Sequence, residues 1–267
     1  MNSQRDFIIE ICREEGIKLD MLSFGYVLSL EKENMKRHIF GAYWDINSAA
    51  ADRIACDKTA CYNLLNTKKI SAIPHVLVFN PLRRSGFIGD KGFWKYACDY
   101  FLEHNKKLVV KPNQGTKGEN VFFCDTISAL ETAIQTIFLL NPDAALSPYH
   151  EVVSEYRVFY LDGKCYFVYG KEKGNSWQHN LSQGAKAFEL KSDDEIKKLA
   201  KIENIAIKAA SCININFATV DVALTSESEY KIMEINSGVQ AKQLLEQLPH
   251  LRNNIKTIYQ DAIKNMF

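Results

Sequence analysis

Three oxygen-bearing side chains lie near the end of the sequence, in two stretches that alternate polar and apolar residues. Asp221 lies in the first stretch, residues 217–224, and Glu234 and Asn236 close the second, residues 230–236. Because alternate side chains of a β-strand point to one face, Glu234 and Asn236 are expected to share a face. If the two strands pair through the polar turn between them, these oxygens converge with those of Asp221. Three such ligands, with substrate phosphate oxygens, suit Mg²⁺, although two half-exposed strands with ordinary polar faces show the same alternation.

A glycine-containing segment follows another strand-like run. Residues 112–120 come directly after Lys111 and contain Gly115 and Gly118. Glycines let a loop bring backbone N–H groups close to phosphate oxygens, and the Lys111 ammonium could reach the same phosphate. The segment is neither a Walker A loop nor a dinucleotide fingerprint, since no GKS/T follows and no helix starts there. Taken alone, it is more simply a hairpin loop with one surface lysine.

Three further polar residues are candidates on weaker grounds. Lys58 lies in a predicted helix, where a lone lysine is normally exposed to solvent. Arg157 lies on a predicted hairpin strand and could bind a carboxylate or phosphate with two hydrogen bonds, or form a cross-strand ion pair with Glu155. Asn180 lies in a loop before a Gln-Gly pair, and by itself this loop indicates nothing.

The composition is that of an ordinary globular protein and excludes several classes. Apolar residues make up 46% and charged residues 24% of the 267-residue chain, and a formal net charge of +1 provides no field that would recruit nucleic acid or an anionic membrane. No apolar run approaches the roughly 20 residues that span a bilayer, and the polar start lacks a signal-peptide stretch. Seven cysteines, an odd number without a CxxC pair, favour free thiols in a reducing cytoplasm over disulfides or a zinc site.

Periodicity and turn signals predict the elements that must position these residues. Helices are predicted over about residues 3–15, 52–68, 93–104, 126–140, 192–212 and 249–265. Strands are predicted over about residues 26–30, 75–79, 108–111, 121–124, 153–161 and 164–170, besides the two stretches above. In the fourth helix, Ile127 belongs to the stripe predicted to be buried.

Two local signals and the order of elements indicate the fold class. Asp162-Gly163 favours a two-residue type I′ turn between paired strands, and Ser192 with Glu195 forms a capping box at a helix start. Strands alternate with helices in the first half, and antiparallel pairs dominate the second. This order predicts an α+β arrangement of subdomains around a cleft.

These segments, in this order, resemble the ATP-grasp superfamily. The resemblance is nearest to the glutamate ligases that modify ribosomal protein and to the ATP-grasp part of cyanophycin synthetase. The matching pieces are residues 49–58 ending in Asp57-Lys58, 108–112 with 114–118, 155–157, 180–184, Asp221, and 233–236. Each motif alone is weak, but six in one order together indicate a fold.

The resemblance implies an α+β ATP-grasp fold, in which two α+β subdomains clasp ATP. A short N-terminal region would cover residues 1–51, and the ATP-grasp domain residues 52–267, with a lid-like central subdomain at about residues 106–172. The N-terminal region is shorter than the family's usual N-terminal domain, which often helps to bind substrate.

The resemblance also implies roles for individual residues. The nucleotide-binding set would be Lys58, Lys111, Gln114, Gly115, Thr116, Gly118, Ser147, Tyr149, Glu151 and Lys171. Lys58 and Lys111 resemble the lysines that hold ATP phosphates, and residues 114–119 resemble the loop that closes over them. Residues 147–149 resemble the adenine hinge, and Glu151 resembles the residue that holds the ribose. Arg157 resembles the arginine that steadies an acyl phosphate and Asn180 the asparagine near the γ-phosphate; with Lys111 they form the implied catalytic set. Asp221, Glu234 and Asn236 match the Mg²⁺ ligands, with Mn²⁺ as an alternative metal.

The sequence departs from the family pattern in three places. The hinge usually carries a glutamate where Pro148 or Tyr149 falls. The loop has Glu119-Asn120 where another glycine is common. Residues 237–240, Ser-Gly-Val-Gln, replace the usual small-residue–proline–glycine turn beside the acceptor pocket, so the substrate's identity does not carry over.

The function that the resemblance implies is ATP-dependent carboxylate–amine ligation through an acyl phosphate, with an amino acid or peptide as substrate. Two alternatives stay open: an ATP-grasp kinase of small molecules, and an inactive nucleotide-binding module, which the missing hinge glutamate favours. No nucleic acid or membrane partner is expected. The sequence leaves open whether a second copy or a partner protein completes the cleft.

Overall fold

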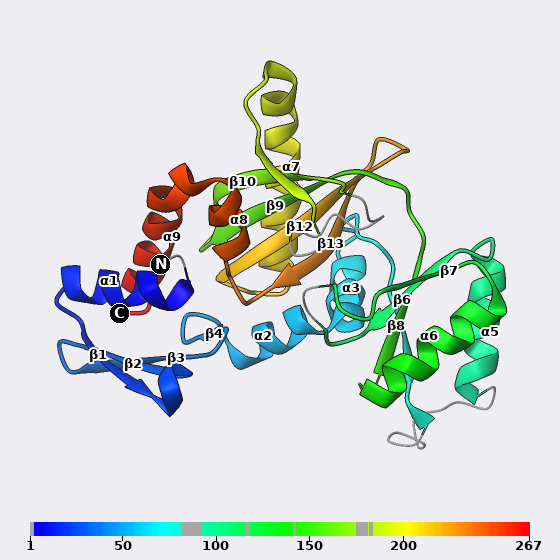
Figure 1. The fold of residues 1–267 in the computed structure, drawn as a ribbon, viewed down its shortest axis with the longest axis horizontal. Helices are drawn as coiled ribbons and strands as arrows, with labels where there is room; N and C mark the ends of the chain where they lie inside the picture. Colours follow the sequence, from blue (N-terminus) through cyan, green and yellow to red (C-terminus); the bar gives the residue numbers. More distant parts are fainter. Residues whose placement is uncertain (1–2, 82–91, 116–117, 141–142, 175–180, 182–183) are drawn as a thin grey trace.

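The computed structural model describes residues 3–81, 92–115, 118–140, 143–174, 181 and 184–267, which form three β-sheets with helices packed on them. Figure 1 shows the sheets side by side along the long axis of the molecule. Within the described residues, the neighbouring strands of each sheet pair antiparallel. Among the helices of the described residues, none is long and apolar enough to cross a lipid bilayer.

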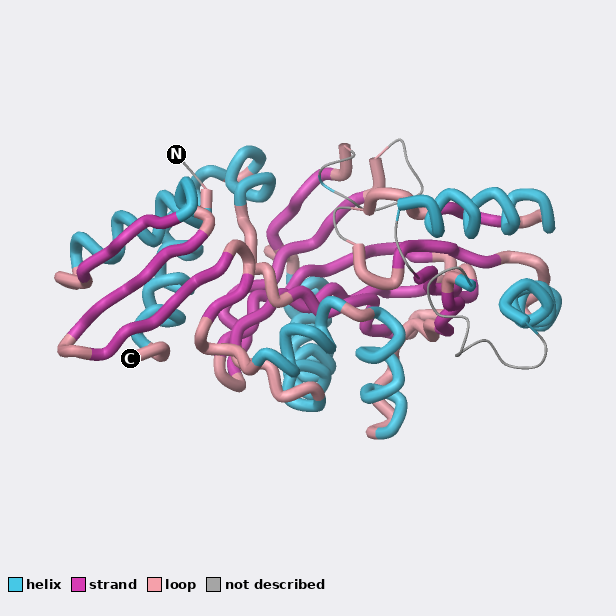
Figure 2. The backbone as a smooth tube through the Cα atoms, turned by 90° about the horizontal axis from the view of Figure 1, so that it is seen from below, coloured by secondary structure: helices cyan, strands magenta, loops and turns pink. Residues whose placement is uncertain are grey.

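The first sheet lies at one end, where the two chain termini also meet (Figures 1 and 2). Its strands are β1 (Lys18–Leu22), β2 (Val27–Lys32), β3 (Met35–Phe40) and β4 (Tyr43–Trp44), and the helices beside it are α1 (Gln4–Glu14) and α9 (Arg252–Lys264). Phe7 of α1 and Trp44 both pack on Tyr259 of α9, with ring centroids 5.4 and 5.9 Å apart. The same core continues to Phe217 in the central sheet, so the first and last segments of the chain are packed into one body.

The central five-stranded sheet carries most of the predicted site residues. Its order is β11 (Lys186–Glu189), β10 (Lys164–Glu172), β9 (Val152–Leu161), β12 (Phe217–Thr225) and β13 (Tyr230–Asn236). The helix α7 (Asp193–Cys212) packs on one face. The predicted hairpin is confirmed, since Asp162 and Gly163 both have positive φ, as a type I′ turn requires. The predicted pairing of the strands at residues 217–224 and 230–236 is also confirmed.

The third sheet has the order β5 (Val76–Phe79), β8 (Asp143–Pro148), β6 (Leu108–Pro112) and β7 (Phe122–Cys124). Two helices, α5 (Gly92–Glu103) and α6 (Ile127–Leu140), contribute to its hydrophobic core. Residues 149–151 connect β8 of this sheet directly to β9 of the central sheet. The segment predicted to form the adenine hinge therefore begins in the last residues of one sheet and leads into the other.

The structure corrects several predictions. The helix predicted over residues 52–68 is two helices, α2 (Ala49–Cys56) and α3 (Lys58–Thr67), because Asp57 between them is extended at φ −106° and ψ 106°. Ile127 is 42% exposed rather than buried, since it begins its helix beyond the edge of the core. The helix predicted from residue 249 starts with one 3₁₀ turn before α9, and a short α8 (Lys242–Gln247) precedes it. Strands β1, β3, β4, β8 and β11 were not predicted.

Candidate active site

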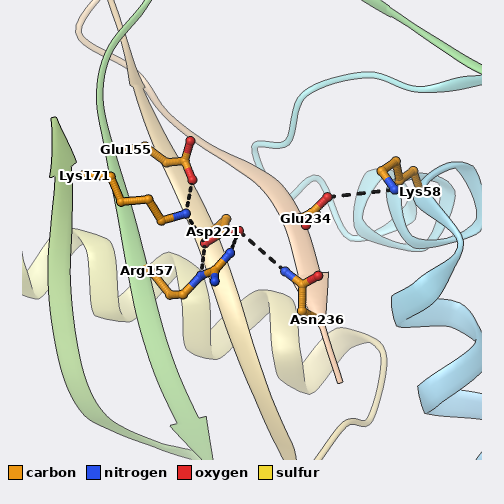
Figure 3. A network of polar contacts seen from close by, with 7 residues as sticks. All are labelled: Lys58, Glu155, Arg157, Lys171, Asp221, Glu234 and Asn236. Carbon is orange, nitrogen blue, oxygen red and sulfur yellow. Dashed lines mark hydrogen bonds and ion pairs between the residues drawn. The ribbon is translucent and has the colours of Figure 1, made fainter. Parts of the chain in front are cut away.

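The three predicted metal ligands lie on neighbouring strands of the central sheet. Asp221 in β12 is directly opposite Glu234 in β13, beside an irregularity in the strand register. The Asn236 amide is 3.5 Å from Asp221 Oδ2, whereas Glu234 points away from this pair, toward α3 (Figure 3). Within the described residues, no group of three or more His, Cys, Asp or Glu side chains gathers closely enough to hold a metal ion. The two carboxylates and one amide share a region of the sheet, and their metal role stays a prediction.

Asp221 is the centre of a buried network of charges. Arg157 donates to both of its oxygens, Nε to Oδ1 at 2.7 Å and Nη2 to Oδ2 at 2.5 Å. Lys171 donates to Oδ1 at 3.1 Å and also forms an ion pair with Glu155. Burial opposes ionisation of Asp221, but the two cations outweigh it and lower the pKa of this carboxyl to about 2. Asp221 is therefore an anion held between two fixed cations.

The register of three adjacent strands explains this network. Arg157 in β9 is directly opposite Asp221 in β12, and Glu155 in β9 is directly opposite Lys171 in β10. The cross-strand ion pair considered for Arg157 exists, but its partner is Asp221 and not Glu155. Lys171, predicted to face the nucleotide, is buried within this network with 3% of its surface exposed. Glu155 was not among the predicted site residues: the two-residue turn alone would place it opposite Gly170, and an irregularity between Cys165 and Phe167 shifts the register so that it lies opposite Lys171.

Lys58 connects three elements and is buried, unlike an ordinary helical lysine. It is the first residue of α3. Its Nζ donates to the Gly115 carbonyl at 2.9 Å and lies 3.9 Å from Glu234 Oε2. The contact brings the start of α3, the glycine segment and β13 to one point, as Figure 3 shows for Lys58 and Glu234.

Lys111 lies at the end of β6, in the same electrostatic environment as Lys58. Burial and the like charge of Lys58 lower the pKa of the Lys111 ammonium to about 8, although Glu234 and Glu155 act in the opposite direction. The buried His75 nearby has a pKa well below its ordinary value, first because of burial and then because of the charges of Lys111 and Lys58. Its Nε2 has no hydrogen-bond partner among the described residues. We infer that His75 is neutral and adds no charge to the site.

The remaining predicted residues are spread along the segments that border this region. Gln114 donates to Asp57 at 3.2 Å, and Gly118 has a φ of +69°, a conformation that suits glycine. Ser147 is buried in β8, and the Tyr149 ring contacts Phe123 edge-on at 4.8 Å. The backbone carbonyl of Glu151 accepts a hydrogen bond from the Ser226 amide. Thr116 and Asn180 lie outside the described residues.

Comparison with known proteins gives one family match. The model of the family described as RimK-like ATP-grasp domain matches residues 55–255. A probable alpha-L-glutamate ligase of Stutzerimonas stutzeri is 29% identical over 49% of this chain and 42% of its own length. The alpha-aminoadipate–LysW ligase LysX of Saccharolobus solfataricus is 25% identical over 60% of each chain, and the tetrahydromethanopterin:alpha-L-glutamate ligase of Methanocaldococcus jannaschii is 28% identical over 51% of this chain and 47% of its own. The matches thus span about half the length of these curated relatives.

Solved structures show the same fold at low sequence identity. A D-alanine–D-alanine ligase from Bacillus anthracis has a TM-score of 0.61 at 14% identity, covering 82% of this chain and 71% of its own. The D-cycloserine synthetase DcsG has a TM-score of 0.56 at 15% identity, covering 79% and 71%. The predicted α+β ATP-grasp fold is confirmed by these neighbours together with the family match.

Proposed function

The chain belongs to the RimK-like ATP-grasp family, and we propose that it is an ATP-dependent ligase that joins a carboxylate to an amine. We place the ATP-grasp domain at residues 52–267, with a lid-like subdomain at about residues 106–172. The names of the curated relatives include L-glutamate and alpha-aminoadipate as substrates, and we propose that an α-amino acid supplies the amine here. The carboxylate partner is an amino acid or peptide in this proposal.

One observation carries the proposal: charged groups from three separate parts of the fold surround one region with a small excess of positive charge. Four cations, Lys58, Lys111, Arg157 and Lys171, interact there with three carboxylates, Glu155, Asp221 and Glu234. Such a region disfavours a lone divalent cation but suits the polyanionic phosphates of ATP with a bound metal. Phosphoryl transfer depends mainly on positioning and charge neutralisation, which this arrangement supports.

The donor set fits Mg²⁺ that arrives with nucleotide. Asp221 and Glu234 offer carboxylate oxygens and Asn236 an amide oxygen, the hard ligands that Mg²⁺ takes together with phosphate oxygens. Because Asp221 already binds Arg157 and Lys171, and Glu234 lies within reach of Lys58, these cations compete with a metal for the same oxygens. When bound, the metal would neutralise phosphate charge.

The proposed reaction has two steps. An oxygen of the substrate carboxylate attacks the γ-phosphorus of ATP, and the bond from this phosphorus to the β–γ bridging oxygen breaks. The products of this step are the acyl phosphate and ADP. The amine nitrogen then attacks the acyl carbon, loses a proton, and inorganic phosphate leaves as the amide forms. Lys58 and Lys111 would hold the phosphates, and Arg157 would steady the acyl phosphate, with the electrostatic stabilisation typical of such sites. Asn180 is assigned to the γ-phosphate in the same proposal.

The test is substrate-dependent product formation. The protein is incubated with MgATP and pooled amino acids and short peptides, and products are sought by mass spectrometry as condensation with loss of water. We expect ADP and inorganic phosphate to be released in equal amounts, and only when an amine is present. A phosphorylated product without free phosphate would instead identify a small-molecule kinase, and failure to bind MgATP would identify an inactive module.

Nucleotide binding should weaken as the pH rises above about 8. Below that pH Lys111 is protonated, and above it the ammonium progressively loses the charge that attracts phosphate. A bound phosphate raises the pKa of Lys111, so binding should take up protons at pH 8–9, and the affinity should fall toward a limiting slope of about tenfold per pH unit. Calorimetric titration of ADP in buffers of different ionisation enthalpy measures both quantities. Lys111→Arg, which stays charged, should flatten the profile, whereas a wild-type affinity that is constant from pH 7 to pH 9.5 would contradict the role of Lys111.

A further inference from the structure

The junction between α3 and the glycine segment is built around Asp57, which the proposed reaction does not use. We call residues 113–115 the loop stem. The Oδ1 atom of Asp57 accepts hydrogen bonds from Ala60 N at 2.9 Å and Thr59 Oγ1 at 3.0 Å. The Oδ2 atom accepts from Asn113 Nδ2 at 2.7 Å and Gln114 Nε2 at 3.2 Å. One carboxylate oxygen therefore caps the helix, and the other binds the loop stem.

Asn113 completes the junction from the other side. It is buried, with 2% of its surface exposed. The backbone carbonyl of Asn113 accepts a hydrogen bond from Lys58 N at 3.1 Å, and its side-chain Oδ1 accepts one from Thr59 N at 3.1 Å. The backbone N–H of Asn113 donates to the Asp143 carbonyl in β8 at 3.2 Å. The loop stem is thus joined both to the third sheet and to the first turn of α3.

These contacts decide what the N-terminus of α3 can bind. A helix N-terminus attracts anions through its free N–H groups, but here the first three N–H groups, those of Lys58, Thr59 and Ala60, are taken by Asn113 and Asp57. At this point a phosphate could therefore be bound by side chains but not by these three backbone N–H groups. The Lys58 side chain is also positioned, because its Nζ donates to the Gly115 carbonyl at 2.9 Å. The position of Lys58 relative to the loop stem is therefore fixed at both the backbone and the side chain.

We propose that Asp57 is a positioning residue whose Oδ2 holds the loop stem against α3, so that Lys58 and the loop backbone meet nucleotide phosphate in one preset geometry. The part about phosphate rests on the proposed function, and the part about the loop stem does not. Preorganisation of this kind saves the ordering that binding would otherwise require. Burial opposes the ionisation of Asp57, but its hydrogen bonds, that from Ala60 first, hold its pKa below the ordinary value, so the carboxylate is an acceptor on both sides at neutral pH.

The plainer alternative is that Asp57 only caps α3, and the chain offers variants that separate the two roles. Serine and asparagine cap helices about as well as aspartate. Asp57→Ser keeps a capping oxygen but is too short to reach Asn113 and Gln114. Asp57→Asn, with its amide oxygen on the helix side, places an NH₂ group against the NH₂ groups of Asn113 and Gln114, so the hydrogen bonds to the loop stem are lost. Adding Asn113→Asp to Asp57→Asn restores a donor–acceptor pair at that contact and leaves an oxygen for Thr59 N.

Hydrogen exchange of the free protein tests the loop stem without nucleotide. We expect amides in the loop stem to exchange at least about tenfold faster in Asp57→Ser and Asp57→Asn, while α3 amides keep their protection, and we expect Asp57→Asn with Asn113→Asp to recover most of the difference. Unchanged exchange in the loop stem of both single variants would overturn the proposal. Loss of protection throughout α3 in both, as large as that in the loop stem, would show that Asp57 acts only through the helix, which also overturns the proposal.

Calorimetric titration of ADP with Mg²⁺ tests the phosphate part on the same variants. We expect a loss of about tenfold in affinity for each single variant and recovery in the double variant. Faster exchange with an unchanged ADP affinity would overturn the role toward nucleotide. A wild-type protein that binds no ADP would refute the proposed function and this part with it, while the exchange data would still decide whether Asp57 holds the loop stem.

Discussion

Replacing Asp221 with alanine should lower the free energy of unfolding by about 3–5 kcal/mol, the usual cost of removing one partner from a buried ion pair. Asp221 is 4% exposed and contacts both Arg157 and Lys171. Without it, the buried Lys171 and the Arg157 side chain, which is 25% exposed, are left with one carboxylate, that of Glu155. The loss is larger than that of a surface ion pair because Lys171, with 4% of its side chain exposed, cannot turn to solvent.

Urea denaturation of the free protein measures this effect without reference to any activity. Glu246→Ala is the control: Glu246 pairs with Lys242 on the exposed surface of α8 at 3.9 Å, with 56% of its side chain exposed, and its loss should cost well under about 1 kcal/mol. Asp221→Asn, which keeps the shape and one acceptor oxygen, should fall between the two. An Asp221→Ala protein as stable as the control would show that the network does not hold the central strands as described.

Replacing Glu234 with glutamine should reduce turnover by at least about a hundredfold while the fold stays intact. The amide oxygen can still face Lys58 at a similar distance, but the negative charge that would bind metal is lost. Glu234 has 29% of its side chain exposed and lies at the edge of the network, 3.9 Å from its cation, so the free energy of unfolding should change little. The Mg²⁺ dependence of ADP affinity should also disappear.

ADP formation under the substrate conditions above, together with ADP affinity with and without Mg²⁺, measures the effect of Glu234→Gln. Glu229→Gln is the control, because Glu229 lies on the adjoining turn, pairs with Lys231 at 2.6 Å and is 53% exposed. Wild-type ADP production by Glu234→Gln, with an unaltered Mg²⁺ dependence, would remove Glu234 from the metal assignment.

The parts of the fold with strong local signals could be predicted from sequence. The β9–β10 hairpin follows from Asp162-Gly163, and the start of α7 from the capping box at Ser192. By contrast, β8 (Asp143–Pro148) contains two adjacent alanines and is buried at its first five positions, so it shows neither alternation nor strand propensity. Strand β1 is exposed at four of its five positions, and its apolar residues do not alternate toward a core.

The candidate site was predicted residue by residue but not as a network. Lys58, Arg157 and Glu234 could be selected from motifs, yet their contacts depend on register between distant segments. The partner of Arg157 is 64 residues away, and that of Asp57 at Asn113 is 56 residues away. The break at Asp57 shows the same limit, since aspartate is tolerated within helices, whereas here its carboxylate caps the following helix.

Calorimetric titration of ADP with and without Mg²⁺ tests most directly whether the charged residues around Asp221, Lys58 and Lys111 form a binding site for nucleotide with metal. We predict micromolar binding with Mg²⁺ and markedly weaker binding without it, because without the metal the carboxylates of Asp221 and Glu234 would repel the nucleotide phosphates, whereas Mg²⁺ would bind both. The same titration with Glu234→Gln should lose the difference. No heat of binding from the wild-type protein under either condition would contradict the claim.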